Sequence, residues 1–232
     1  MKKREGKARS PRASRAKTLT TKPTAVAAAG LPTAQSRGRG RTASMRRATK
    51  ETQIELDVSL DGDGRTQIST GLGFLDHMLT ALAHHARLDL DLRCRGDLHV
   101  DDHHSVEDVA LALGRGIDQA LGDRAGIVRF GWAYAPLDEA LARAVVDLSG
   151  RPAPIIKLRL RRGRLGEVES ENLVHFMQSL ATAMRASLHV DVLRGDNEHH
   201  KAEAAFKALA LALRQALARD GSGVVRSTKG VL

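Results

Sequence analysis

The chain has 232 residues, of which 42% are hydrophobic, enough for one sizeable core or for two fused halves. Its net charge of +10 would suit nucleic-acid binding, but the charge is unevenly placed. Residues 1–50 carry 15 Lys or Arg and one acid, a net +14, whereas residues 51–232 carry 22 basic and 26 acidic residues, a net −4. The body of the chain is therefore mildly acidic, and we expect it to need no nucleic acid for its function.

Two further features narrow the class of protein. No hydrophobic run reaches the roughly 18 residues of a membrane span, and no secretory signal core is found, so we expect no membrane partner. The single cysteine, Cys94, excludes an internal disulfide framework and suits a reducing compartment. We expect a cytoplasmic protein, or a plastid protein if the N-terminal segment is a transit peptide.

Residues 1–45 are predicted to be a disordered basic extension, because they lack apolar periodicity and cannot offset their ordering entropy by burial. Three interpretations stay open. A transit peptide is Arg- and Ser-rich and poor in acids. A basic arm could bind polyanions nonspecifically. The segment could also be an upstream extension, with Met45 as the true beginning and residues 46–232 as the folded domain.

The folded domain is predicted to begin with a hairpin. Apolar and polar residues alternate over Thr52–Leu60, which indicates a strand with one buried face. The Asp-Gly-Asp-Gly sequence at 61–64 is a strong turn signal, and residues 65–70 are predicted to return as the partner strand.

Helices and strands alternate beyond the hairpin. The patterns predict helices over Phe74–His85 and from Asp102, a good N-cap residue, and strands over 88–95, 127–135, 140–148, 155–160 and 188–192. This is an α/β pattern, with one sheet in each half of the domain and helices packed on it.

A metal-ligand sequence occurs twice, as His103-His104-x-x-Glu107 and His199-His200-x-x-Glu203, each with a lone histidine upstream, His77 or His175. An Arg-Gly-Asp sequence precedes each pair, and an apolar helical pattern follows it. A repeat of about a hundred residues indicates a duplicated half-domain, so we divide the body at 46–135 and 136–232. Imidazole and carboxylate are ligands that borderline divalent metals prefer.

Helical geometry favours two metal ions. Each glutamate lies three and four residues after its histidines and shares a helix face with them. Adjacent histidines point about 100° apart, so one His-His pair can serve two metals, one on each side. His84, His99 and His189 lack the repeated pattern and are interpreted as ordinary surface or core residues, and His85 is intermediate.

A second set of residues could hold an anion. Arg129 lies on a predicted strand, Arg151 lies at a strand end, and Ser227 and Lys229 lie in the C-terminal loop. Arginine offers bidentate contacts to phosphate and lysine a point charge. Each residue taken alone is more typical of a solvated surface charge, and the sequence does not show that the four converge.

Seven ordered motifs resemble the imidazoleglycerol-phosphate dehydratase family, and the resemblance covers about residues 45–232. They are Gly73-Phe74-Leu75-Asp76-His77-Met78-Leu79, Gly96-Asp97-Leu98-His99-Val100-Asp101-Asp102-His103-His104, Pro136-Leu137-Asp138-Glu139-Ala140, Asp147-Leu148-Ser149-Gly150-Arg151-Pro152, His199-His200, Phe206-Lys207-Ala208 and Ser227-Thr228-Lys229-Gly230.

The resemblance implies a fold, an assembly and a reaction. Each half has a small mixed sheet with two helices on one face, and subunits assemble through trimers into a hollow shell of 24, with active sites between subunits. The enzyme, a hydro-lyase of histidine biosynthesis, converts D-erythro-imidazole-glycerol phosphate to imidazole-acetol phosphate and water.

The resemblance also assigns the site, with two Mn²⁺ per active site, although other divalent metals are possible. The implied metal ligands are His77, His103, His104, Glu107, His175, His199, His200 and Glu203. The implied substrate contacts are Glu51, His85, Arg129, Arg151, Ser227 and Lys229. Glu51 is the candidate for proton handling. Many members carry glutamine where this chain has Ala81, so that contact must be absent or replaced.

Two other functions fit part of the pattern. A dinuclear metallohydrolase acting on a phosphorylated small molecule would also use paired metals, to activate water. A noncatalytic metal-storage shell would need the ligands but would have no use for the cationic residues.

Overall fold

The computed structural model of the protein describes residues 40–230 and Leu232. The expectations for residues 1–39 lie outside the described residues. Among the helices that the structure describes, none is both long and apolar enough to cross a membrane.

The first half of the domain is a four-stranded mixed sheet with two helices. Its elements are β1 (Thr42–Ala48), β2 (Thr52–Ser59), β3 (Thr66–Ser69), α1 (Gly73–Ala86), β4 (Asp89–Gly96) and α2 (His103–Leu121). The strand order is β1-β2-β4-β3, in which only β3 and β4 pair in parallel.

The second half repeats this arrangement. Its elements are β5 (Phe130–Leu137), β6 (Ala140–Asp147), β7 (Ala153–Lys157), α3 (Ser170–Ala183), β10 (Ser187–Arg194) and α4 (Glu198–Leu217). The order β5-β6-β10-β7 has the same pairing senses, strand for strand, as the first sheet. A small hairpin of β8 (Arg164–Leu165) and β9 (Val168–Glu169) is inserted before α3. The predicted duplication is confirmed.

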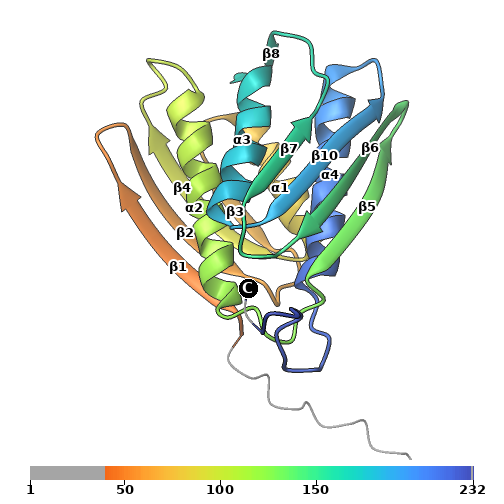
Figure 1. The fold of residues 1–232 in the computed structure, drawn as a ribbon. Coiled ribbons are helices and arrows are strands. Elements are labelled where there is room, and N and C mark those ends of the chain that lie inside the picture. Colours follow the sequence, from red (N-terminus) through yellow and green to blue (C-terminus); the bar gives the residue numbers. More distant parts are fainter. Residues whose placement is uncertain (1–39, 231) are drawn as a thin grey trace, which may run out of the picture. The chain divides into compact units, whose positions relative to one another are not determined.

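The four helices lie between the two sheets (Figure 1). Each sheet turns alternate residues inward, so that Leu56 of β2 and Ala144 of β6 are almost fully buried against helices. The helices pair across the duplication, α1 with α4 and α2 with α3. Gly114 permits close contact in the second pair, because a Cβ there would lie 2.7 Å from the Cβ of Ala183.

The predicted hairpin of residues 52–60 and 65–70 is wrong. The turn at 61–64 forms, but β4 lies between β2 and β3, because α1 carries the chain across before β4 enters the sheet. The carboxylate of Asp89, the first residue of β4, accepts hydrogen bonds from the backbone N–H groups of Asp63 and Arg65, at 2.9 and 3.0 Å. The turn at 61–64 therefore joins β2 to β3 across β4, which lies between them, and Asp89 of β4 holds the turn.

The predicted domain boundaries also shift. β1 begins at Thr42, before the expected start at residue 46, and Met45 lies in the middle of that strand. The division between halves falls between α2 and β5, within residues 122–129, because the strand expected at 127–135 pairs with β6 of the second half. Strand β1 belongs to the folded core, since Ala43 is buried.

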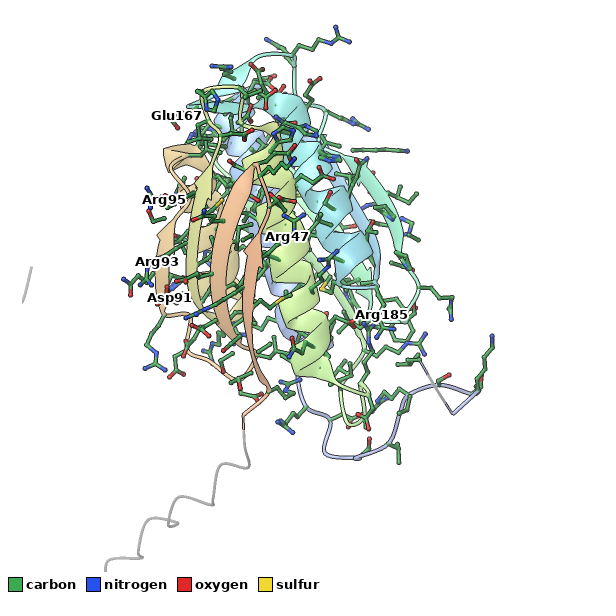
Figure 2. All side chains as sticks on the ribbon, turned by 90° about the vertical axis from the view of Figure 1, so that its left-hand side faces the viewer. Arg47, Asp91, Arg93, Arg95, Glu167 and Arg185 are labelled. Carbon is green, nitrogen blue, oxygen red and sulfur yellow. The ribbon has the colours of Figure 1, made fainter. Side chains whose placement is uncertain are left out.

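Two arginines hold β1 in place. Arg41 donates to an Asp61 carboxylate oxygen at 2.6 Å and to the carbonyl of Leu217, the last residue of α4, at 2.7 Å. Arg47 points from β1 to Asp108 on α2, whereas Arg93 and Arg95 project from the opposite face of the first sheet (Figure 2).

We predict that a chain beginning at Met45 is less stable than one beginning at Gly40. The shorter chain lacks Arg41 and the first three residues of β1, so its free energy of unfolding should fall by about 2–4 kcal/mol, the cost of losing hydrogen bonds to a charged group together with buried surface. Urea titration measures the difference. Equal unfolding midpoints for the two chains would show that this end of β1 adds nothing.

The Asp61 carboxylate should make stability pH-dependent. Its hydrogen bond with Arg41 holds the pKa of Asp61 far below its ordinary value of 3.8. A lowered folded pKa contributes stability above the unfolded pKa and loses it as pH falls. Asp61→Asn should therefore lower the free energy of unfolding by about 1 kcal/mol at pH 7, and by progressively less as the pH falls below the ordinary pKa of Asp. A penalty that is the same at pH 3 and pH 7 in thermal melts would contradict this assignment.

Candidate metal centre and anion-binding hollow

The two His-His-x-x-Glu sequences form the first turns of α2 and α4. The side chain of Asn197 caps α4 by accepting hydrogen bonds from the backbone N–H groups of His199 and His200, at 2.9 and 3.3 Å. In α2 the side chain of Asp101 accepts the equivalent hydrogen bond from the backbone N–H group of His103. The predicted cap Asp102 does not make it, because its buried carboxylate instead accepts from partners on the α3 side of the structure.

One ligand cluster, here called the His77 cluster, joins α1 to α4. It consists of His77, His199 and Glu203. The Nε2 atoms of both histidines lie 3.1 Å from the same oxygen of Glu203. Burial raises the pKa of Glu203, but Lys207, 2.7 Å from its other oxygen, and the two histidines lower it to about 2. The cluster therefore presents two nitrogens and an ionised carboxylate to one point.

A second cluster, here called the His175 cluster, joins α2 to α3. It consists of His103, Glu107 and His175. Glu107 lies 3.7 Å from His103 Nε2 and 3.4 Å from His175 Nε2. The His103 and His175 rings stack, with centroids 4.9 Å apart. The Nε2 atom of His175 is buried and makes no hydrogen bond with any described residue, so it has a lone pair or proton without a partner.

Both clusters fit a borderline divalent metal. Each offers two imidazole nitrogens and a carboxylate oxygen whose ligand atoms lie within 4.8 Å of one another. The unpartnered Nε2 of His175 and the shared glutamate oxygen of the His77 cluster both point to a cation. Each cluster takes one helix from each half, so neither half holds a complete set by itself.

Buried polar residues orient the His175 cluster. The Nδ1 atom of His103 lies 3.0 Å from the Asn172 side-chain oxygen, and the Asn172 amide donates to Asp102 at 2.9 Å. Asp102 also accepts from the N–H of Glu169. A bond at Nδ1 leaves Nε2 of His103 directed toward Glu107 and free to act as a ligand atom.

The outer histidine of each pair lies outside both clusters. His104 Nδ1 is 3.1 Å from Asp97, and its Nε2 is 3.8 Å from Glu51. His200 Nδ1 is 2.8 Å from Glu139. These hydrogen bonds raise the pKa of His104 and of His200. The structure thus gathers six of the eight predicted ligands into two clusters and leaves two directed elsewhere.

The predicted anion-binding residues converge at a hollow of ≈ 450 Å³. It is lined by Arg129, Arg151, Arg226, Ser227, Thr228, Lys229 and Leu232. Arg129 has a φ of +73° and is held by the Asp147 carboxylate at 2.7 and 3.1 Å. Within the described part of the chain, Arg151 and Lys229 form no ion pair, so their charges are available to an anion.

The hollow and the clusters lie at opposite ends of the helices. The Arg129 N–H donates to the carbonyl of Ala216, near the C-terminus of α4, whereas Glu203 is in the second turn of that helix. The 13 positions from Glu203 to Ala216 correspond to about 20 Å of helix. Figure 1 shows the C-terminal segment at this end, away from the helix N-termini.

Two predicted residues lie outside the hollow. Burial lowers the pKa of His85, which lies in the last turn of α1. The positive charge of Lys207 on α4 lowers it further. Glu51 is near His104. Sequence reasoning missed Asp97, Glu139 and Asn172 as partners of the histidines. Asp97 and Glu139 lie inside the motifs that carry the family resemblance, and this is the one sequence signal that could have indicated them. Asn172 lies in none of these motifs.

The fold and the site define a duplicated α/β protein with two His–Glu clusters between its halves. A family model for imidazoleglycerol-phosphate dehydratase matches residues 70–213. A protein of that name from Phytophthora nicotianae is 56% identical over 210 residues, covering 90% of this chain and 46% of that protein. The dehydratase of Salinibacter ruber is 53% identical over 83% of this chain and 96% of its own length.

Solved structures agree. The Staphylococcus aureus dehydratase is 36% identical with a TM-score of 0.70, covering 77% of this chain and 99% of that one. The Pyrococcus furiosus structure is 38% identical with a TM-score of 0.71, covering 81% and 100%. The chain belongs to the imidazoleglycerol-phosphate dehydratase family, whose members are hydro-lyases that act in histidine biosynthesis. The predicted family and class of enzyme are confirmed.

Asn172→Ala should destabilise the fold as well as loosen His103. The change leaves the Asp102 carboxylate, only 4% exposed, without one of its two donors, which should cost roughly 1–3 kcal/mol in urea unfolding of the metal-free protein. Glu171→Ala, an exposed position on the same helix, is the matched control and should change stability little. A similar, small effect of both substitutions would mean that the Asp102–Asn172 bond is dispensable.

Proposed function

We propose that this chain dehydrates D-erythro-imidazole-glycerol phosphate to imidazole-acetol phosphate at a site with two divalent metal ions, Mn²⁺ being the ion that the family resemblance implies. The observation that carries the proposal is the presence of two equivalent His–Glu clusters in a chain that also has a cationic hollow. The first suits an azole ring bound by metals, and the second suits a phosphate.

The metals would be held by more than one copy of the chain. Each cluster supplies three ligands, fewer than most borderline metals take, while His104 and His200 direct their Nε2 atoms away from both clusters. An outer histidine of one copy can complete the cluster of another. Trimers that assemble into a shell of 24, as the resemblance implies, would provide such contacts.

The phosphate would likewise be held by another copy. The hollow lies about 20 Å along α4 from the His77 cluster, by the rise of an α-helix. Three carbons separate ring from phosphate in the substrate, which is too short to bridge that distance. A single active site would therefore combine the hollow of one copy with the clusters of a neighbour.

The reaction removes a hydroxide from the carbon beside the imidazole ring and a proton from the next carbon. The resulting enol becomes the ketone by moving one proton from oxygen to carbon. Bound metal ions would orient the ring and act as Lewis acids that stabilise negative charge developing in it. Arg151 and Lys229 would hold the phosphate, and Glu51, 52% exposed and close to His104, would handle a substrate proton.

An assay of product separates this reaction from metal-dependent hydrolysis, the alternative function for paired metal sites. Incubation of the full chain with Mn²⁺ and imidazole-glycerol phosphate should produce a ketone phosphate with no release of inorganic phosphate. A chelator should abolish turnover, and added Mn²⁺ should restore it. Phosphate release without ketone would favour the hydrolase.

Glu51→Gln should lower turnover about 10²- to 10⁴-fold, as expected for loss of a general acid–base group. Substrate binding should change little, because the amide keeps the shape of the side chain. Glu55→Gln, an exposed glutamate on the outer face of β2, is the control and should leave turnover at the wild-type rate. Wild-type turnover of the Glu51 variant would remove this residue from the mechanism.

A further inference from the structure

The duplicated halves carry matching acids around their outer histidines. Glu51 immediately precedes β2, and Glu139 immediately precedes the equivalent strand β6. Asp97 follows β4, and Asp196 follows β10, each in an Arg-Gly-Asp sequence. If the halves worked alike, matching acids would hold matching histidines.

They do not work alike. In the second half, Glu139 holds His200 Nδ1 at 2.8 Å, and its other oxygen accepts from the N–H groups of Asp196 and Asn197 at 3.1 and 2.8 Å. In the first half, Asp97 holds His104 Nδ1 with both oxygens, at 3.1 and 3.3 Å. In the second half the carboxylate that holds the outer histidine thus comes from the turn between β5 and β6. In the first half it comes from the Arg-Gly-Asp loop after β4.

The length of the loop after the Arg-Gly-Asp sequence accounts for this difference in the histidine's partner. Six positions separate Asp97 from His103, but only three separate Asp196 from His199. The shorter loop turns its backbone amides onto Glu139 and leaves the side chain of Asp196 exposed. The longer loop lets Asp97 reach the histidine, so the carboxylate of Glu51 forms no hydrogen bond with any described residue.

We propose that Asp97 and Glu139 are positioning residues that occupy different places in the duplication, and that this exchange frees Glu51 for the substrate. Each one fixes Nδ1 of an outer histidine, so that the histidine keeps its proton there and offers the Nε2 lone pair to a metal. This inference rests on the proposed function, because it assumes that His104 and His200 bind metal.

Titration of the metal-stripped full chain with Mn²⁺, in competition with a chelating indicator, tests the assignment. Two ions should bind per chain in the wild type. Asp97→Asn and Glu139→Gln should each weaken one of the two by about 10- to 100-fold and leave the other unchanged. Asp196→Asn, the counterpart of Asp97 in the repeat, and Glu51→Gln should leave both unchanged.

Thermal melting of the metal-free variants separates positioning from folding, since a positioning role predicts weaker metal binding without a matching loss of stability. Either amide variant suffices for the test if the other does not fold. An Asp196→Asn effect equal to that of Asp97→Asn, or wild-type affinity in both amide variants, would overturn the proposal. Failure of the wild type to bind Mn²⁺ would instead refute the proposed function.

Discussion

The pairing of helices across the duplication is the constraint on which the rest of the structure depends. A His–Glu pair on one helical turn offers only two ligands on a shared face, so a third must come from another helix. α1 supplies it to α4, and α3 supplies it to α2. The two sheets enclose the four helices and bury the apolar faces that fix these pairings, with Gly114 letting α2 and α3 approach closely.

This constraint has a consequence for the outer histidines. Because His103 and His199 turn into the clusters, the adjacent residues must point out of them, with ring planes tilted by 77° and 86°. Carboxylates at Nδ1 fix the outer rings, and the cationic hollow sits at the far end of α4. The chain thus carries the parts of a site without bringing them together, which is why the proposed function requires several copies.

Local sequence patterns predict much of the fold and of the candidate site. The repeated ligands, the turns and the alternating strands are short-range features, so the duplication and the members of both clusters could be predicted. β1 could not, because its inward residues are Ala43, Met45 and Arg47, and the last finds its partner Asp108 61 positions away. The position of β3 depends on β4 entering the sheet 20 residues later, and the turn before it gives no sign of this.

The polar partners of the histidines could not be predicted from local patterns either. Glu139 meets His200 across 61 positions, and Asn172 meets His103 across 69, through pairings of helices and hairpins that no local pattern encodes. The duplication itself was misleading here, since it predicts that Asp97 and Asp196 act alike. A difference of three residues in loop length was enough to separate their roles.

Complementation between two defective chains tests most directly whether the site is shared between copies. Arg151→Ala damages only the hollow, and Glu203→Gln only the His77 cluster. Each variant alone should be nearly inactive, but differently tagged chains, co-expressed and purified as hybrids, should regain up to about a quarter of wild-type turnover by random assortment. Hybrids of Arg151→Ala with Lys229→Ala, both in the hollow, should regain none. Hybrids of Arg151→Ala with Glu203→Gln that are no more active than their parents would contradict a site built from two copies.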